Sequence, residues 1–554
     1  MGSDGVAAAR EAYAAGDWRT ARALLERHHA EEPLATDDLE LLGRALWWLG
    51  DTAGSREVAD DVYRARVVDD PAAAAAVALE LTLSWALEGD VVIGQAWLNR
   101  ARRLLRDIEE CPAHGYLVYL EGGIALEMTG DTEPAARGAE VVHDLARRFD
   151  DEALEALALV LSGLAALWSG RTVDGFGDLD EAMLSVLNGA LPPMWAGDVH
   201  CSVIHLCHEL GDLARMRAWT DTMNHWSAAL SQTFLFAGVT RVHQLQLLAA
   251  EGSWDLVEHE VGAASRALVG AHGWVAGEGY RELGDVRRLR GDLPGARSAY
   301  DRARDLAVTP QPGLALLDEA EGRPAAALAG LRAAVAETGR IGRARLLLPT
   351  VEVALRVGDR TLAEAALSDL TETADLHGTP GLRAWTDHAT ACLLLHDGDG
   401  DRALPHLEAA AAVYRSQRCR HATARVHELV ARVHDVRGEG ALAAAERATA
   451  RAIYERLGAG PDVARLSPHR PPGGLTEREV EVLRCVLRGA SNRDVAQALV
   501  ISEKTVSRHL ANVYAKAGVT SRTAAAAWAR EHGIEAAPAP NTPRTPDEVA
   551  PSAR

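Results

Sequence analysis

Residues 475–534 read LTEREVEVLRCVLRGASNRDVAQALVISEKTVSRHLANVYAKAGVTSRTAAAAWAREHGI. This stretch contains four amphipathic helical patterns. Each pattern follows a hydroxyl residue whose oxygen can accept a hydrogen bond from a free backbone N–H at the start of a helix. These capping residues are Thr476, Ser491, Ser502 and Ser521. The segment therefore predicts four short helices.

The third of these patterns has two unlike faces. Val506, Leu510, Val513 and Ala517 recur at the spacing of one buried helical stripe, and the opposite face carries small and polar residues. A short helix, a tight turn and a longer helix with a polar outer face are typical of a helix-turn-helix, which places its second helix in the major groove of DNA. An ordinary bundle of capped helices has the same local features, so the pattern leaves both interpretations open.

The residue identities favour the first interpretation, because the segment resembles the LuxR-type DNA-binding domain. The resemblance implies a four-helix fold with a scaffold helix at 492–499 and a recognition helix at 503–516. The residues that carry it are Leu475, Thr476, Arg478, Glu479, Glu481, Val482, Leu483, Gly489, Ser491, Asn492, Arg493, Val495, Ala496, Leu499, Ser502, Glu503, Lys504, Thr505, Val506, His509, Asn512, Lys516, Gly518, Val519, Ser521, Arg522 and Thr523.

The resemblance also implies a role for each position of the site. Base contacts are expected from Ser507, Arg508 and Ala511, of which Arg508 alone is long enough to hold a guanine with two hydrogen bonds. The fourth helix is where such domains dimerise, so a homodimer on double-stranded DNA is expected. Phosphate-backbone contacts, which position a protein without reading sequence, are expected from Asn492, Ser502, Lys504, Thr505, His509, Asn512, Lys516 and Arg522.

The chain that precedes this segment is repetitive. A Gly-Asp dipeptide, or a similar one, recurs every 31 to 42 residues, and this period marks arrays of helical hairpins. Several repeats, such as the one with Tyr13 and Trp18, resemble the tetratricopeptide repeat. The sequence thus predicts an all-α protein in which about twelve hairpins form a superhelix. The turn glycines are Gly16, Gly50, Gly89, Gly130, Gly170, Gly211, Gly252, Gly291, Gly322, Gly358, Gly400 and Gly438.

Composition changes suggest the domain boundaries. The repeats occupy 1–458, and 459–474 is expected to be a linker without helix because it contains four prolines. The helix-turn-helix domain occupies 475–535. The tail 536–554 has no apolar periodicity and is expected to be disordered.

Charge is distributed unevenly along the chain. The whole protein has a net charge of −21, yet residues 470–535 hold ten Lys and Arg against seven Asp and Glu. An acidic repeat region repels nucleic acid, so only the C-terminal segment is expected to approach phosphates. Lys504 and Lys516 are the only lysines, which excludes a GxxxxGK[ST] phosphate-binding loop and lysine-based Schiff-base chemistry from the repeats.

No catalytic or metal site is expected. No Ser-His-Asp or paired-carboxylate arrangement stands out, so we expect no enzyme activity and no cofactor. Five ligand-type residues gather near residue 200, but a packed helix explains them better than zinc does. They are His200, Cys201, His205, Cys207 and His208. The N-terminus has no apolar leader, and the longest uncharged apolar stretch, 156–170, is too short to span a bilayer. The protein is therefore expected to be soluble and cytoplasmic, with no membrane partner.

The sequence as a whole predicts a bacterial transcriptional regulator. Its repeat region would sense a protein or a small molecule in the superhelical groove and control the C-terminal domain. This arrangement is similar to that of the MalT-like regulators without their ATPase domain. An interaction scaffold with a weak or vestigial DNA-binding domain is the alternative, and a hydrolase ranks last because no nucleophile motif is present.

Overall fold

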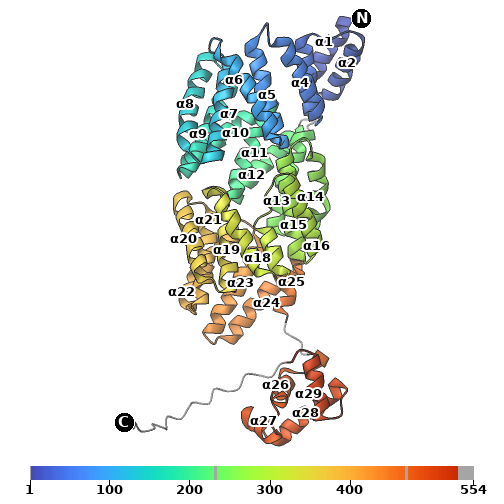
Figure 1. Cartoon of the computed structure of the whole chain (residues 1–554), viewed down its shortest axis with the longest axis vertical. Helices are drawn as coiled ribbons and strands as arrows, with labels where there is room; N and C mark the ends of the chain where they lie inside the picture. The colour runs from blue at the N-terminus through green and yellow to red at the C-terminus, as the bar shows by residue number, and fades with distance from the viewer. Residues whose placement is uncertain (1, 230–233, 468–471, 535–554) are drawn as a thin grey trace, which may run out of the picture. The chain divides into compact units, whose positions relative to one another are not determined.

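The computed structural model describes residues 2–229, 234–467 and 472–534, and these residues form helices and loops without a strand. The all-α prediction is therefore confirmed for the described residues. The chain divides between Arg465 and Leu466 into two compact units (Figure 1). None of the helices described has both the length and the apolar character needed to cross a membrane.

The first unit consists of helical hairpins. Consecutive helices pair from α1 with α2 to α23 with α24, which gives twelve hairpins in the described part of the chain, and one short helix follows. The helices are α1 (Gly2–Ala14), α2 (Trp18–Glu31), α3 (Thr36–Trp48), α4 (Thr52–Arg66), α5 (Pro71–Glu88), α6 (Val91–Arg106), α7 (Pro112–Thr129), α8 (Thr132–Phe149), α9 (Glu152–Trp168), α10 (Thr172–Leu187), α11 (Pro193–Glu209), α12 (Leu213–Ala229), α13 (Phe234–Glu251), α14 (Trp254–Leu268), α15 (Gly273–Arg290), α16 (Leu293–Asp305), α17 (Gly313–Ala320), α18 (Pro324–Glu337), α19 (Arg340–Val357), α20 (Arg360–His377), α21 (Pro380–His396), α22 (Gly400–Ser416), α23 (Arg420–Val436), α24 (Gly440–Leu457) and α25 (Gly460–Leu466).

The turn inside each hairpin has a local cause. At the second hairpin, Gly50 has a φ of +81°, a left-handed conformation that glycine adopts without steric cost. The carboxylate of Asp51 then accepts a hydrogen bond from the backbone N–H of Gly54 at 3.0 Å and caps α4. Eleven of the twelve predicted turn glycines have this positive φ.

The exception corrects the prediction for Gly400. The segment 397–401 reads DGDGD and offers two registers for the turn. In the structure Gly398 has the positive φ, at +80°, and Asp399 caps α22 through the N–H of Arg402 at 3.1 Å. Gly400 is instead the buried first residue of α22, where a Cβ would lie 3.3 Å from the Val433 side chain. Packing against the neighbouring hairpin therefore decided the register.

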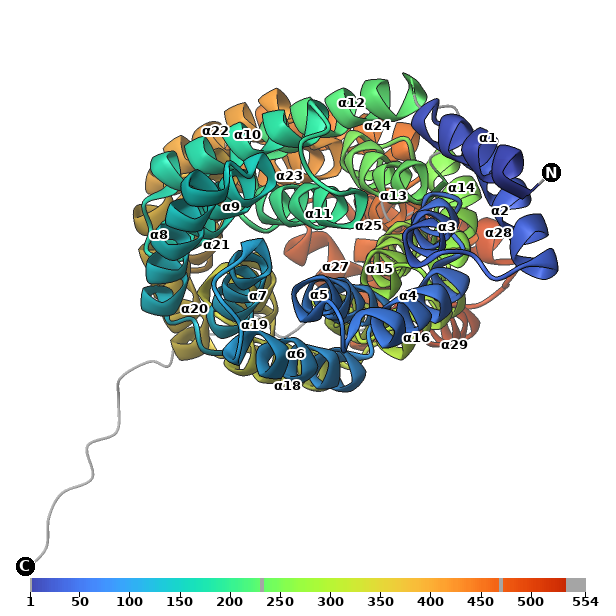
Figure 2. The same ribbon diagram turned by 90° about the horizontal axis from the view of Figure 1, so that it is seen from above.

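Successive turns of the superhelix touch one another. Figure 2 shows the hairpins of the first unit following one another around a ring. Residues about two hundred positions apart then meet: Thr52 Oγ1 donates to the carbonyl of Gly270 at 2.9 Å, and Gln417 Nε2 donates to the carbonyl of Gly211 at 2.8 Å. Side chains from one turn of the superhelix thus satisfy backbone carbonyls of the neighbouring turn.

The segment expected to be a linker without helix contains α25, so that expectation is wrong for 460–466. Pro461 lies in the first turn of α25, where its missing N–H costs no hydrogen bond. Asp462 Oδ2 lies 2.9 Å from His421 Nε2, and Arg465 donates to Glu428 at 2.9 Å. These bonds hold α25 on the last hairpin. Residues 468–471 of the linker and all of 536–554 lie outside the described residues.

The second unit is a small bundle with its own core. It contains α26 (Glu477–Leu487), α27 (Asn492–Ala498), α28 (Glu503–Ala517) and α29 (Arg522–Glu531), and the 3₁₀ turn η1 (Pro472–Gly474) precedes them. The four predicted helices are therefore present. The buried core residues are Leu475, Val480, Val482, Leu483, Cys485, Val486, Val495, Ala496, Val506, Leu510, Val513, Ala525, Ala529 and Ile534.

Candidate nucleic-acid interface

Four caps fix where the helices of the second unit begin. Thr476 Oγ1 accepts from the N–H of Glu479, whose carboxylate accepts from the N–H of Thr476 at 2.7 Å, and this reciprocal pair is the predicted capping box. A second box joins Ser491 to Asp494 before α27. The start of α28 is capped by Ser502 and that of α29 by Ser521, as the sequence predicts.

The turn between α27 and α28 sets the direction of the second helix. Val500 has a φ of +52°, which is uncommon for a β-branched residue, and the residue is 91% exposed. Arg478 on α26 donates to the carbonyl of Leu499 at 2.5 Å, so the end of α27 is tied to the core helix. A short helix and a longer one thus meet at a fixed turn, which is helix-turn-helix geometry.

The outer face of α28 is exposed and carries positive charge. Lys504, Ser507, Arg508, Ala511 and Asn512 are all exposed, whereas the valines and leucine of the opposite stripe are buried. Within the described part of the chain, neither Lys504 nor Arg508 has an ion-pair partner. Because no carboxylate neutralises them, both cations are available to a ligand, and the small residues beside Arg508 allow close approach of a groove.

Three predicted contact residues form a hydrogen-bonded chain across the unit. Arg522 Nη1 donates to Asn492 Oδ1 at 2.7 Å, and Asn492 Nδ2 donates to Ser507 Oγ at 3.3 Å. Ser507 Oγ in turn donates to the carbonyl of Glu503 at 3.0 Å. A second guanidinium nitrogen of Arg522 donates to the carbonyl of Ala490. Arg522, at the start of α29, therefore binds the start of α27 directly and reaches Ser507 on α28 through Asn492.

Lys516 is also held inside the unit. Its Nζ lies 2.7 Å from Glu479 Oε2, and the Glu479 side chain is only 3% exposed. Burial by itself would raise the pKa of Glu479, but hydrogen bonds from Lys516 and from the backbone of Thr476 outweigh it and lower that pKa. Lys516 thus neutralises a buried carboxylate that caps α26, so the structure gives it a positioning role.

Replacing Lys516 with alanine should destabilise the second unit by roughly 1–3 kcal/mol at neutral pH, because the buried carboxylate of Glu479 loses its partner. A carboxylate with a lowered folded-state pKa contributes stability above its ordinary pKa and loses it as the pH falls through the folded value. The difference should therefore shrink in acid. Hydrogen exchange of the amides in α26 and α28 measures it, with Lys504→Ala as the unpaired control; equal protection in both variants would contradict this role.

The other predicted phosphate contacts either cap the start of α28 or lie on its surface. Ser502 Oγ and Thr505 Oγ1 lie 2.8 Å apart at the start of α28. His509 is half-buried, and its Nδ1 has no hydrogen-bond partner within the residues that the structure describes. Asn512 is exposed. The first turn of α28 thus gathers several polar groups beside its free backbone N–H groups, a setting that suits a phosphate.

The residues near position 200 do not converge on a metal. Cys201 Sγ lies 3.4 Å from His272 Nε2, and the ring of His205 packs edge-on against Trp274 at 4.7 Å. Burial, with help from neighbouring imidazoles, lowers the pKa of His200 to about 3, as expected of a neutral histidine inside a core. Among the described residues another set, Glu352 with His388 and Cys392, brings its ligand atoms within 4.8 Å of one another. The Glu352 carboxylate is already paired with Arg425 at 2.5 Å.

Comparison with known families identifies the second unit. Residues 474–529 match the model of the family described as bacterial regulatory proteins, luxR family. The second unit is a LuxR-type domain. This short domain is 47% identical over 58 residues to the CsgBAC operon transcriptional regulatory protein of Escherichia coli, across 10% of this chain and 27% of that protein. It is 42% identical over 60 residues to the response regulator protein VraR of Staphylococcus aureus, across 11% of this chain and 29% of VraR.

A longer similarity extends beyond the LuxR-type domain. A Mycobacterium tuberculosis protein, provisionally named an HTH-type transcriptional regulator, is 27% identical over 425 residues, which cover 71% of this chain and 46% of that protein. The chain therefore spans about half the length of the curated relatives that it matches most extensively. Among solved structures, the APC/C hetero-tetramer Cut9-Hcn1 aligns with 83% of this chain and 95% of the matched chain, at 14% identity and a TM-score of 0.33.

Proposed function

We propose that the protein is a DNA-binding transcriptional regulator whose LuxR-type domain inserts α28 into the major groove of double-stranded DNA. The observation that carries this proposal is the outer face of α28, where Lys504 and Arg508 are exposed and unpaired among the described residues. Many arginines elsewhere in the described residues are instead ion-paired, such as Arg290 with Asp255 and Glu258. Two free cations on a rigid helix are what binding to a polyanion requires.

The contacts divide by the chemistry of each side chain. Arg508 is proposed to hold a guanine, with Ser507 and Ala511 against neighbouring bases. Lys516 and Arg522 are proposed to position the helices, because the structure occupies both with internal partners. Phosphates would be held by Asn492, Ser502, Lys504, Thr505, His509 and Asn512.

The repeat unit is proposed to control this domain, and the protein is proposed to be cytoplasmic. Residues 1–469 carry 46 basic and 70 acidic side chains, so their field opposes the approach of DNA. A protein or small-molecule effector bound to the repeats would change that opposition, and dimerisation through α29 would place two α28 helices on two half-sites. The boundaries proposed for the functional parts are 1–465, 466–474, 475–535 and 536–554, because α25 belongs to the repeat unit.

An interaction scaffold with a vestigial DNA-binding domain remains the second candidate. The observation that favours it is the modest base-reading surface, since Ser507 already exchanges hydrogen bonds with Asn492 and Glu503, and Ala511 has no polar group. A scaffold would bind its protein partner through the repeats whether or not DNA is present.

The test is a titration of genomic DNA fragments with the full chain and with the fragment 466–534. We expect both to bind, with affinity falling as salt rises, and the fragment to bind more tightly because it lacks the acidic repeats. Circular dichroism of the fragment establishes that it is helical before the comparison. Equal affinities would reject control by the repeats, whereas no binding by either form would reject the DNA-binding function and favour the scaffold.

A further inference from the structure

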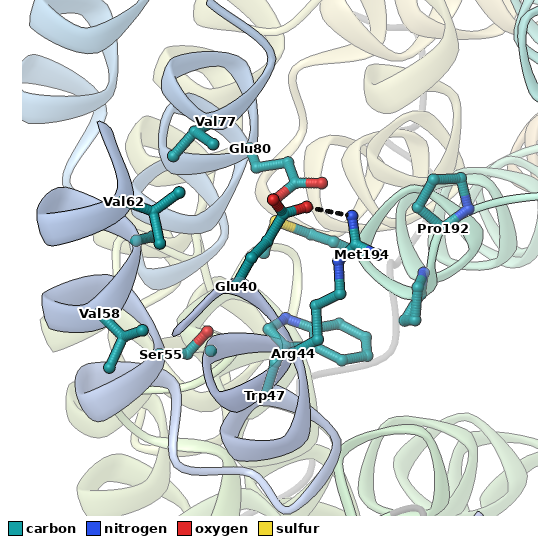
Figure 3. A pocket seen from close by; sticks show the side chains of 13 residues that line it. Glu40, Arg44, Trp47, Ser55, Val58, Val62, Val77, Glu80, Pro192 and Met194 are labelled. Atoms are coloured by element: carbon teal, nitrogen blue, oxygen red, sulfur yellow. Dashed lines mark hydrogen bonds and ion pairs between the residues drawn. The ribbon is translucent and has the colours of Figure 1, made fainter. Parts of the chain in front are cut away.

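A pocket of about 50 Å³ lies between the second and third hairpins of the repeat unit (Figure 3). Helices α3, α4 and α5 form most of it, and the start of α11 lies against them from more than a hundred residues further along the chain. The residues that line it are Glu40, Gly43, Arg44, Trp47, Ser55, Val58, Ala59, Val62, Val77, Glu80, Pro192, Pro193 and Met194.

Most of the pocket wall is apolar. Val58, Val62 and Val77 lie along one side, and Met194 and Trp47 are among the other lining side chains (Figure 3). Side chains of this kind stabilise the hydrocarbon part of a ligand by removing it from water. The wall thus fits a small molecule with an apolar body.

The polar groups of the pocket are unevenly satisfied. Glu40 Oε1 accepts from Arg44 at 2.6 Å, and Glu40 Oε2 accepts from Arg66 at 3.0 Å, so this carboxylate is neutralised twice. Glu80, on α5, has no hydrogen bond or ion pair within the described part of the chain. Figure 3 shows the Glu80 carboxylate turned toward that of Glu40. One carboxylate of the pair therefore lacks a counter-ion.

The charged and titratable groups around Glu80 do not supply it with a paired cation. Burial raises the pKa of Glu80 to about 7, Glu40 adds to the rise and Arg44 opposes it. The other titratable groups that interact with Glu80 are the phenols Tyr13 on α1 and Tyr116 on α7, both uncharged at neutral pH. No cation from these elements fully compensates the carboxylate.

We propose that this pocket binds a small organic amine, whose ammonium group pairs with Glu80 beside Glu40 and whose apolar body packs on the valines, Met194 and Trp47. An anion fits less well, because Arg44 is already paired with Glu40 and the repeat unit is strongly acidic. The face of an indole also attracts ammonium groups. This binding site is independent of the DNA-binding proposal, because it involves the repeat unit alone.

The experiment is calorimetric titration of the full chain with hexylamine, hexanol and hexanoate, which share one hydrocarbon chain. We expect hexylamine to bind most tightly. Because the bound ammonium requires an ionised Glu80, and its pKa is about 7 in the free protein, affinity for hexylamine should be roughly tenfold weaker at pH 6 than at pH 8. Hexanoate binding more tightly than hexylamine, or no binding of the amine at either pH, would overturn the proposal.

Two variants separate the site from the rest of the protein. Glu80→Gln should weaken hexylamine binding by at least about tenfold and remove the pH dependence. Glu282→Gln is the matched control, because Glu282 is on α15, has a pKa raised to about 8 mainly by burial and lies outside this pocket. If Glu80→Gln does not fold, Ala59→Leu provides the test, because it fills the pocket and keeps the carboxylate. Undiminished amine binding by Ala59→Leu would overturn the proposal.

Discussion

Replacing Arg508 with alanine should weaken binding to the cognate DNA site by about 1–3 kcal/mol, which is roughly five- to 150-fold, and should relax discrimination at one base pair. Arg508 is the long side chain in the middle of the exposed face of α28, and the described residues hold no carboxylate paired with it. Competition binding of the full chain to the cognate site and to single-base variants of that site measures the loss.

The matched control is Lys504→Ala on the same helix. Lys504 is exposed and unpaired like Arg508 but lies in the first turn of α28, where phosphates are expected. Its loss should weaken binding to every sequence by a similar factor and reduce the slope of log K against log salt by about one. If Arg508→Ala also weakened binding to every sequence by a similar factor, Arg508 would be a phosphate contact and would not discriminate between bases.

Replacing Gly381 with alanine should destabilise the repeat unit by about 1–3 kcal/mol, because two turns of the superhelix meet backbone to backbone at this glycine. A Cβ at position 381 would lie 2.4 Å from the carbonyl oxygen and 2.6 Å from the Cα of Gly211, which is one superhelical turn earlier. Backbone cannot give way as the end of a side chain can. Chemical denaturation followed by far-ultraviolet circular dichroism measures the loss.

Gly177→Ala is the control for this prediction. Gly177 also lies inside a helix, α10, but a Cβ there would meet nothing within 4 Å. Alanine should stabilise that helix by roughly 0.5–1 kcal/mol, because glycine loses more backbone entropy on folding. If both substitutions had the same effect, helix propensity would explain them, and the contact between turns would contribute nothing to stability.

Features with local causes could be predicted from the sequence. The capping boxes at Thr476 and Ser491 and the turn glycines depend on residues no more than four positions apart, so the pattern indicates them directly. The exposed face of α28 follows in the same way from the spacing of Val506 and Leu510. The LuxR-type domain was therefore recognisable from its residues, and the family comparison bears this out.

Features with distant causes were not predictable. Lys516 is 37 residues from Glu479, and nothing in the spacing shows that a predicted phosphate contact is held by a buried carboxylate. The choice between Gly398 and Gly400 depended on Val433 in the next hairpin. Likewise α25 forms in a proline-containing segment because His421 and Glu428 of the last hairpin bind it.

The sequence by itself predicted about twelve helical hairpins, four capped C-terminal helices and an uneven distribution of charge, and the described residues contain these hairpins and helices. The helices follow from capping hydrogen bonds and from apolar spacing within a few residues, and the charge distribution follows from the composition. Only the tertiary structure decided that Gly211 meets Gly381, that Glu80 faces Glu40 in a pocket completed by α11, and that Arg522 binds Asn492. Such contacts depend on the small rotation between successive repeats, which accumulates over many hairpins and is set by packing rather than by any short stretch of sequence.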